Sequence, residues 1–491
     1  MLGALERAPF SIRAPSRRSA CWGLGRYTWH MPMLTVDNPF TGETACTVAL
    51  ASATAVSAVL DHARAAAREF RASPLADRIV LCEKAIVAME KRADAIATDI
   101  SSMMGKPLDQ AKGEVNGMAT RARYMMSIAE ASLADIVLPP KDNFDRRIVK
   151  EPLGVVLDLP AWNYPLLTAV NAIIPAVLAG NAVIVKHSPR SPLCGEHFAR
   201  AFEEAGAPRH LVQALHCDHP TSEATVGDRR VDGVLFTGSV FGGHRIQEAA
   251  AKRFLHLGLE LGGNDPAYVA ADCDVGKVAA SIVDGAIYNA GQSCCAVERV
   301  YVHRSLYAKF VDAAEALVRA YVLGDPLSPA TTLGPIAQPD HVTDLEVFVA
   351  DAKASGARVV AGGKRTHVDG RGRFFEATLM ADVPQSAKLM RHESFGPILP
   401  IAAVESDEEA LARMNDSELG LTASVWTLDR GRALRMARNL EFGTVFMNRC
   451  DALDPALPWS GVKDSGRGVT LSALGFDQLT RPKALHFKLT P

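Results

Sequence analysis

The sequence predicts an α/β fold with two parallel-sheet domains, and three observations support this. Short apolar segments alternate with helix-length segments from Gly154 to Glu260, and the alternation resumes from about Gly262 to Cys450. The chain has 491 residues, of which 48% are hydrophobic, enough for two or three domain cores. Strands separated by helix-length connections form βαβ units, whose parallel sheets are covered by helices on both faces.

Helices are expected first, over 55–70, over 76–100 and after a turn at 105–107. A polar segment over 136–150 could pair as strands. The first α/β block follows, with strands expected over 154–160, 182–187, 211–215, 233–238 and 254–261 and helices over 165–179, 192–205 and 242–253. In the second block we expect helices over 279–291 and 305–321 and strands over 299–303, 357–363 and 398–404.

Composition excludes several classes of function. The formal net charge is −2, which provides no strong field for nucleic acid or a membrane surface. No apolar run reaches the roughly 18 residues of a spanning helix. Nine cysteines without metal-site spacing indicate free thiols, a reducing, cytoplasmic compartment and no bound metal.

Residues 1–31 differ from the rest of the chain. They contain Glu6 as the only acidic residue and five arginines: Arg7, Arg13, Arg17, Arg18 and Arg26. This composition is typical of an organelle transit peptide, although Met31 or Met33 could instead be the true initiator. In either case the segment is expected to lie outside the fold.

Two candidate ligand-binding features follow strands. Phe236–Gly243 is a glycine-bounded turn that opens a helix, where backbone N–H groups can receive phosphate, although such turns are also common without a ligand. Lys186 lies just after a strand, at the edge where α/β folds bind ligands, and it could equally be an ordinary solvated lysine.

Three further segments hold residues suited to catalysis. Glu260 ends an apolar strand, where desolvation would raise its pKa toward that of a general base, unless the N–H groups of the next turn bind it. Asn163 lies in a strand-to-helix loop and could donate to an oxyanion or simply cap the helix. The adjacent Cys294 and Cys295 lie on a loop, and local sequence does not decide between reactivity and packing.

Eight segments in order resemble the NAD(P)-dependent aldehyde dehydrogenase superfamily. They are "NPFTGE", "PAWNYPL", "VIVKHSP", "FTGSVFGG", "LELGGNDP", "NAGQSCCA", "ESFGPIL" and "LPWSGVKDSGRG". The residues of segments such as "KHSP", "GQSCCAVERV" and "GVKDSGRG" are most similar to those of a poorly characterised branch with semialdehyde dehydrogenase-like members. The resemblance implies an NAD(P)-binding Rossmann-type domain over 32–131 and 151–261, an α/β catalytic domain over 262–452, and a small β extension for oligomerisation over 132–150 and 470–491.

The resemblance also implies roles for individual residues. Cys294 matches the nucleophile, Glu260 the general base and Asn163 the oxyanion donor. The cofactor, NAD or NADP, would be bound by a larger set: Trp162, Lys186, Ser188, Gly238, Ser239, Gly243, Glu393 and Phe395. Tyr164, Ser293 and Asn171 would contact the substrate, a small-molecule aldehyde. A homodimer or homotetramer is implied.

The chemistry that the resemblance implies is oxidation of an aldehyde to a carboxylic acid through a thiohemiacetal and a thioester at Cys294. A CoA-acylating relative is the alternative enzyme, although those relatives generally lack the base that Glu260 provides. A catalytically silent scaffold is the other alternative.

Three positions depart from the family pattern. Pro189 replaces a ribose-binding Glu of many NAD enzymes, so the choice between NAD and NADP stays open. Asn171 replaces an Arg that binds the carboxylate in succinate-semialdehyde enzymes. Asn264 replaces a common Lys. Asn171 argues against a carboxylate-bearing aldehyde unless another cation substitutes. Tyr164, Trp162 and Ser293 would line a substrate tunnel with an aromatic wall and few charges, which suits an uncharged aliphatic or aromatic aldehyde.

Overall fold

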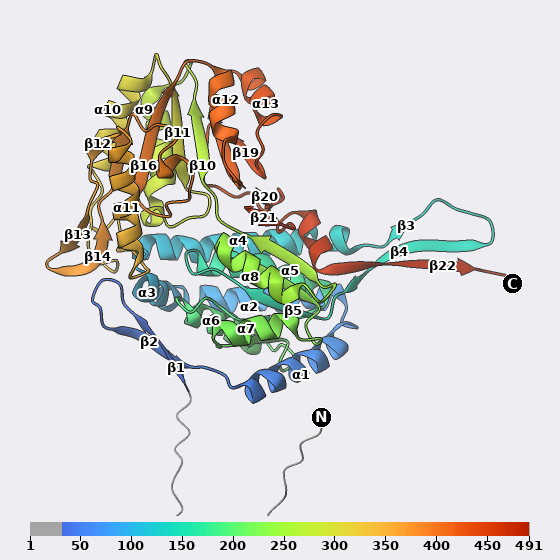
Figure 1. The fold of residues 1–491 in the computed structure, drawn as a ribbon. Helices are drawn as coiled ribbons and strands as arrows, with labels where there is room; N and C mark the ends of the chain where they lie inside the picture. The colour runs from blue at the N-terminus through green and yellow to red at the C-terminus, as the bar shows by residue number, and fades with distance from the viewer. Residues whose placement is uncertain (1–31, 491) are drawn as a thin grey trace, which may run out of the picture.

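The structure, a computed structural model, describes residues 32–490. The interpretations of residues 1–31 therefore lie outside the described residues. Figure 1 shows two α/β domains, one above the other, with a narrow sheet that projects from the lower domain. This arrangement confirms the α/β architecture that the sequence predicts.

The first domain is built on a six-stranded sheet in the order β21-β9-β8-β5-β6-β7. Its five parallel strands are β5 (Val155–Leu159), β6 (Ala182–Val185), β7 (Val212–Ala214), β8 (Gly233–Thr237) and β9 (His256–Glu260). The parallel strands end at one edge of the sheet, which is where α/β folds bind ligands. A ribbon of β1 (Met33–Asp37) and β2 (Thr44–Ala49) lies beside this domain.

Helices cover this sheet. They are α1 (Ala53–Phe70), α2 (Leu75–Glu90), α3 (Ala93–Met104), α4 (Leu108–Leu133), α5 (Pro165–Ala179), α6 (Pro192–Glu204), α7 (His219–Gly227) and α8 (Val240–Ala250). The single helix expected over 76–100 is two, because Arg92 leaves the helical conformation at φ −108° and ψ 15°. Its guanidinium donates to Glu204 and to the His197 carbonyl, tertiary contacts that a local pattern does not reveal. Helix α7 was not anticipated.

The second domain has a seven-stranded sheet in the order β12-β15-β16-β11-β10-β18-β19. Its strands are β10 (Asp265–Val269), β11 (Val297–His303), β12 (Arg358–Ala361), β15 (Thr378–Ala381), β16 (Ile398–Val404), β18 (Thr422–Trp426) and β19 (Thr444–Met447). Its helices are α9 (Val275–Ile287), α10 (Tyr307–Val318), α11 (His341–Ala354), α12 (Asp407–Asn415) and α13 (Arg430–Ala437). Small pairs complete it, β13 (Arg365–Val368) with β14 (Arg371–Phe375), and β17 (Leu419–Gly420) with β20 (Val462–Lys463).

A three-stranded sheet forms the projecting arm in Figure 1. It consists of β3 (Ile136–Val137), β4 (Phe144–Pro152) and β22 (Thr480–Lys488), with β4 in the centre. Several of its hydrophobic side chains are exposed: Ile136, Val137, Leu138 and Phe487. None of the helices within residues 32–490 has both the length and the apolar character required to cross a membrane.

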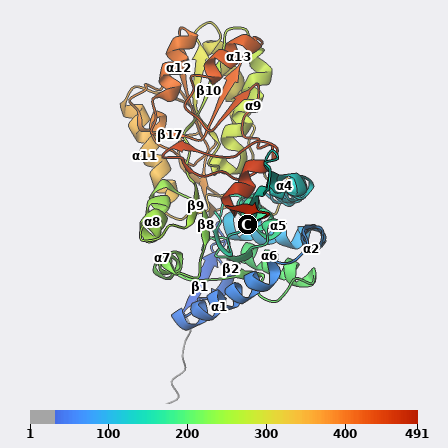
Figure 2. The same cartoon turned by 90° about the vertical axis from the view of Figure 1, so that its right-hand side faces the viewer.

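The C-terminal segment links the two domains. Strand β21 (Gly466–Arg467) pairs antiparallel with β9, so that Gly466 lies opposite Glu260. The short helix Ala473–Gln478 then packs against α4 and α5. In Figure 2 this red segment lies between the domains, beside α4.

A buried ion pair fixes the start of α5 against α4. Glu114 accepts hydrogen bonds at Oε1 from the backbone N–H groups of Leu166 and Leu167, at 2.8 and 3.3 Å. Its Oε2 pairs with Lys106, whose Nζ lies 3.8 Å from the centre of the Tyr164 ring. A carboxylate is favourable at a helix N-terminus, so Glu114 holds the loop that carries Asn163 and Tyr164.

Replacing Glu114 by Ala should lower the free energy of unfolding by about 3–5 kcal/mol, because it leaves the buried Lys106 unpaired. Glu90→Ala is the matched control, since it removes an exposed pair with Arg123 and should cost less than about 1 kcal/mol. Urea unfolding followed by circular dichroism measures both variants. Equal, small losses would contradict the role given to Glu114.

Candidate active site

A cavity of about 900 Å³ lies where the two domains meet, at the carboxyl ends of the first sheet. Residues of the first domain line most of it, and Cys294, Gln338, His341, Glu393 and Phe395 line it from the second. Its volume is at the upper end of the range for small-molecule and cofactor sites.

The first domain places three of the expected cofactor residues along this cavity. Lys186 follows β6, and burial lowers the pKa of its ammonium group. Ser188 lies two residues on, and its hydroxyl accepts a hydrogen bond from the Arg190 backbone. Ser239 caps α8 by accepting from the Gly242 N–H at 3.1 Å, so the positive end of the α8 dipole faces the cavity.

The two expected glycines differ in position. Gly238 lines the cavity, whereas Gly243 does not, and Gly242 occupies the lining instead. A Cβ at Gly243 would lie 2.6 Å from the Leu261 side chain. Gly243 therefore serves the close packing of α8 on the strand that ends at Glu260.

The second domain contributes a carboxylate, Glu393, and an aromatic ring, Phe395, to the lining of the cavity. Glu393 accepts from the Gly263 N–H at 2.9 Å, and burial together with the charge of Glu298 raises its pKa well above the ordinary value. Phe395 contacts Trp162 edge to face, with ring centres 5.6 Å apart. Both rings line the cavity.

Glu298 supports this loop and was not anticipated from the sequence. Its buried carboxylate accepts from the backbone N–H groups of Ser394 and Phe395. Asn264 donates to it at 3.0 Å and to the His392 carbonyl at 3.2 Å. Asn264, one of the departures from the family pattern, thus holds the loop that carries Glu393.

The loop before Cys294 has an unusual backbone. Asn289, Ala290 and Gly291 all adopt positive φ, between 55° and 68°. A Cβ at Gly291 would lie 2.0 Å from the Gly396 carbonyl oxygen, so only glycine fits there. The Gln292 amide then bridges the Asn289 carbonyl and the Ala337 N–H. These contacts fix the path of the chain into Cys294.

Asn163 is tied to the same loop. Its Nδ2 donates to the Gln292 carbonyl at 3.1 Å, and Asn289 donates to both the Asn163 and Gln292 carbonyls. Asn163 is buried, yet it lines the cavity together with Cys294. The second Nδ2 hydrogen of Asn163 is thus available to an oxygen of a molecule bound there.

The two cysteines separate into different environments. Cys294 is partly exposed and lines the cavity. Cys295 is buried, and its Sγ donates to Asp451 at 2.9 Å. The neighbouring Cys294 sulfur, burial and the Asp451 charge together raise the pKa of Cys295, which keeps it a protonated thiol.

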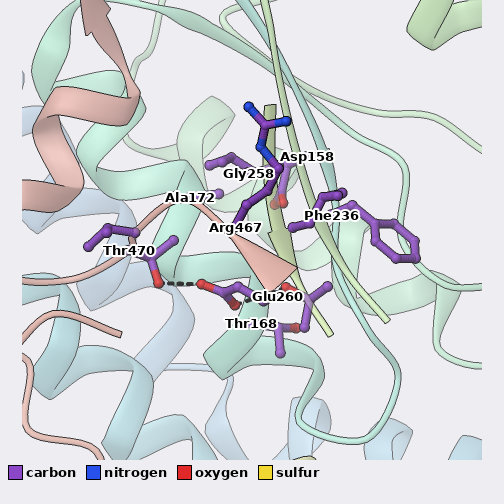
Figure 3. A pocket seen from close by; sticks show the side chains of 13 residues that line it. Asp158, Thr168, Ala172, Phe236, Gly258, Glu260, Arg467 and Thr470 are labelled. Atoms are coloured by element: carbon purple, nitrogen blue, oxygen red, sulfur yellow. Dashed lines mark hydrogen bonds between the residues drawn. The ribbon is translucent and has the colours of Figure 1, made fainter. Parts of the chain in front are cut away.

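Glu260 lines a separate, small cavity of about 10 Å³, which Figure 3 shows. Its carboxylate accepts hydrogen bonds from Thr237, at 3.1 Å, and from Thr470. Burial raises its pKa, whereas the two hydroxyl donors and the charge of Arg121 oppose the shift. Asp158 lines the same cavity, and burial followed by the charge of Glu260 raises its pKa as well.

The expected substrate residues, Tyr164, Asn171 and Ser293, do not line the large cavity. Ser293 is buried, with its Oγ 3.5 Å from the Cys295 Sγ. Asn171 is buried in α5 and accepts at Oδ1 from Arg121 at 3.3 Å. Tyr164 lies over Lys106.

The substrate tunnel with few charges stays a prediction, but charged groups lie beside the residues that were expected to form it. Lys106 lies over the Tyr164 ring, and Arg121 donates to Asn171. The charges of Asp451 and Glu114 act on Tyr164. Burial raises the pKa of Asp451 to about 7. Sequence spacing did not reveal them because they reach the site from segments far from Cys294 in the chain.

Comparisons with known proteins identify the family. The family model described as "Aldehyde dehydrogenase family" matches residues 29–485. An "Aldehyde dehydrogenase" of Paenarthrobacter nicotinovorans is 36% identical over 93% of this chain and 99% of its own. A "Succinate-semialdehyde dehydrogenase [NADP(+)]" of Deinococcus radiodurans is 34% identical over 93% of this chain and 94% of its own.

A solved structure, an NAD-dependent aldehyde dehydrogenase from Sinorhizobium meliloti, superposes with a TM-score of 0.91 at 30% identity. The match covers 94% of this chain and 92% of that one. Both the sequence and the fold are therefore shared over nearly the whole chain. The chain belongs to the aldehyde dehydrogenase family and is an NAD(P)-dependent aldehyde dehydrogenase.

Proposed function

We propose that this enzyme oxidises its aldehyde to a carboxylic acid through a thioester on Cys294, which water then hydrolyses. One observation carries the proposal. Cys294 and Asn163 line the same cavity as Lys186 and Glu393, so that a nucleophile and an amide donor face the expected cofactor groups.

In the first step the Cys294 thiolate attacks the aldehyde carbon, and the carbonyl oxygen becomes an alkoxide. The free Nδ2 hydrogen of Asn163 is placed to donate to that oxygen, because its other hydrogen is held by Gln292. Collapse of the alkoxide expels hydride and leaves a thioester on the sulfur. Cys295 takes no part in the attack, since it stays protonated on Asp451.

In the second step water attacks the thioester, and Glu260 removes a proton from that water. The acid is released and Cys294 is regenerated. Because Glu260 lies against Thr237 and Thr470, its side chain must turn toward Cys294 to act. The two threonine hydroxyls therefore define a resting position for the base.

NAD(P)⁺, when bound, accepts the hydride. The residues fit a dinucleotide: the α8 N-terminus beside Gly238 suits a phosphate, and Lys186 from the first domain and Glu393 from the second suit ribose groups. Ser188, Ser239, Phe395 and Trp162 complete the lining.

We propose that NADP is accepted as well as NAD. Pro189 lines the cavity three residues after Lys186 and offers no carboxylate that would repel a 2′-phosphate. The Deinococcus radiodurans relative is named for NADP(+) and the Sinorhizobium meliloti one for NAD, so the family itself allows both.

We also propose that the arm assembles the enzyme into a homodimer or homotetramer. The outer strands β3 and β22 leave backbone groups and hydrophobic side chains exposed, which natural proteins usually cover. A second copy of the chain is the partner that such an edge fits.

The turnover number kcat should fall as pH falls, with an apparent pKa above 4.5, the ordinary value for glutamate. The reason is that burial raises the pKa of Glu260 and only its ionised form accepts a proton. Glu260→Gln should keep a pre-steady-state burst of NAD(P)H, slow the steady-state rate at least a hundredfold and remove the acidic limb. A missing burst, or rate rescue by added CoA, would overturn the hydrolytic mechanism.

Pro189→Glu should raise the KM for NADP at least tenfold and change the KM for NAD much less, because the new carboxylate meets the 2′-phosphate. Pro189→Gln matches it in size without the charge. Initial rates with both cofactors measure the effect. If wild type already rejects NADP, or both variants behave alike, Pro189 does not determine cofactor choice.

A further inference from the structure

We propose that Arg121 binds the anionic end of the substrate, which makes this enzyme selective for aldehydes that carry a carboxylate. The proposal deepens the function proposed above and rests on it. The carboxylate-binding cation then lies on helix α4. In succinate-semialdehyde enzymes of the family it is an Arg at the position of Asn171, on α5.

Close packing of two helices brings Arg121 to the site. A Cβ at Gly117, one turn earlier on α4, would lie 3.2 Å from Leu167 on α5, so the absence of a side chain lets the helices approach. Arg121 then donates from Nη1 to the Leu167 carbonyl at 3.2 Å and to Asn171 Oδ1 at 3.3 Å.

Those two contacts leave most of the guanidinium without a protein partner. Within residues 32–490 no carboxylate oxygen lies within 4.0 Å of it. Its Nε and Nη2 donate to no atom of those residues, and neither atom is sealed from open space. Nε and Nη2 form the edge of the guanidinium that binds the two oxygens of one carboxylate.

The guanidinium lies close to the reacting groups. Burial lowers its pKa, and the nearby carboxylates of Glu260 and Glu114 act on it in the opposite direction. Arg121 in turn lowers the pKa of Glu260. The Glu114 carboxylate pairs with Lys106, and the Glu260 carboxylate accepts from Thr237 and Thr470. Neither carboxylate therefore neutralises Arg121 by direct contact.

A partly buried cation without a paired anion is costly, and an anionic substrate would remove that cost. Asp451 is a further acidic residue nearby, but its carboxylate accepts a hydrogen bond from Cys295. Its carboxylate oxygens lie more than 4.0 Å from the guanidinium nitrogens of Arg121. Cys294 and Leu453 pack against a buried apolar cluster that includes Trp459 and Leu471. A short aliphatic aldehyde that ends in a carboxylate combines both features.

Asn171 acts as a positioning residue in this arrangement. Where the semialdehyde enzymes of the family have an Arg, this chain has an acceptor for Nη1 of Arg121. An Arg at position 171 would place a second guanidinium group beside that of Arg121. The Asn171 amide instead accepts a hydrogen bond from Arg121 and holds it in place. The relative named for succinate semialdehyde is consistent with a carboxylate-bearing substrate reached by this different route.

The test compares 4-oxobutanoate with its uncharged methyl ester, so that only the anion differs. The wild-type ratio of kcat/KM, acid over ester, should be at least 10. Arg121→Gln should lower that ratio at least tenfold, mainly through KM for the acid, and Arg121→Lys should give an intermediate ratio. Arg123→Gln is the matched control, since Arg123 lies on the exposed face of α4 with Glu83 and Glu90.

A wild-type ratio near 1, or the same ratio in Arg121→Gln, would overturn the assignment. If neither aldehyde yields NAD(P)H, the proposed function fails, and binding decides the subsite separately. Calorimetry with succinate should then show binding to the wild type and to Arg123→Gln and at least tenfold weaker binding to Arg121→Gln. Equal binding to all three proteins would rule out an anion site at Arg121.

Discussion

The site depends on two close approaches, at the adjacent residues Gly262 and Gly263. A Cβ at Gly262 would lie 2.4 Å from Glu393 Oε2, and one at Gly263 would lie 2.3 Å from the Cys294 carbonyl oxygen. Only Leu261 separates these two residues from Glu260. The absence of two side chains therefore lets the proposed base, the proposed nucleophile and the proposed cofactor-binding carboxylate converge from three segments.

Buried carboxylates then define the chemistry of this junction. Glu298 and Glu393 are satisfied by backbone N–H groups, which hold their loop at the cavity edge. Glu260 is held only by threonine hydroxyls, which a side-chain rotation can break. Burial in this low-dielectric interior raises the pKa of Glu260 toward that of a general base. It also strengthens the electrostatic interaction of Arg121 with the groups around it.

The sequence predicted the features that have a local cause. Helix α5 and strand β16 have the expected bounds, because their apolar runs end at a glycine turn and a polar residue respectively. Trp162, Asn163, Lys186 and Cys294 meet in one cavity, since each follows a strand or a helix at the shared edge.

What the sequence did not show depends on tertiary contacts. In the sequence, nothing distinguishes Arg121 from other arginines on an amphipathic helix. Its position depends on the close packing of α4 on α5 at Gly117 and Leu167. Glu298 lies within a strand, and only the folded chain shows which N–H groups it binds. The break between α2 and α3 depends on Arg92 contacts with α6. In each case the partner is distant in the chain, so no local pattern contains it.

The central claim, a thioester on Cys294 resolved by Glu260, is tested most directly by mass spectrometry of the Glu260→Gln enzyme. The variant is mixed with NAD(P)⁺ and an aldehyde that the wild type oxidises, quenched in acid and digested. We predict an acyl adduct on Cys294 that is absent in the Cys294→Ser double variant and retained in the Cys295→Ser one. Formation of NAD(P)H without an adduct, or an adduct on Cys295, would contradict the account.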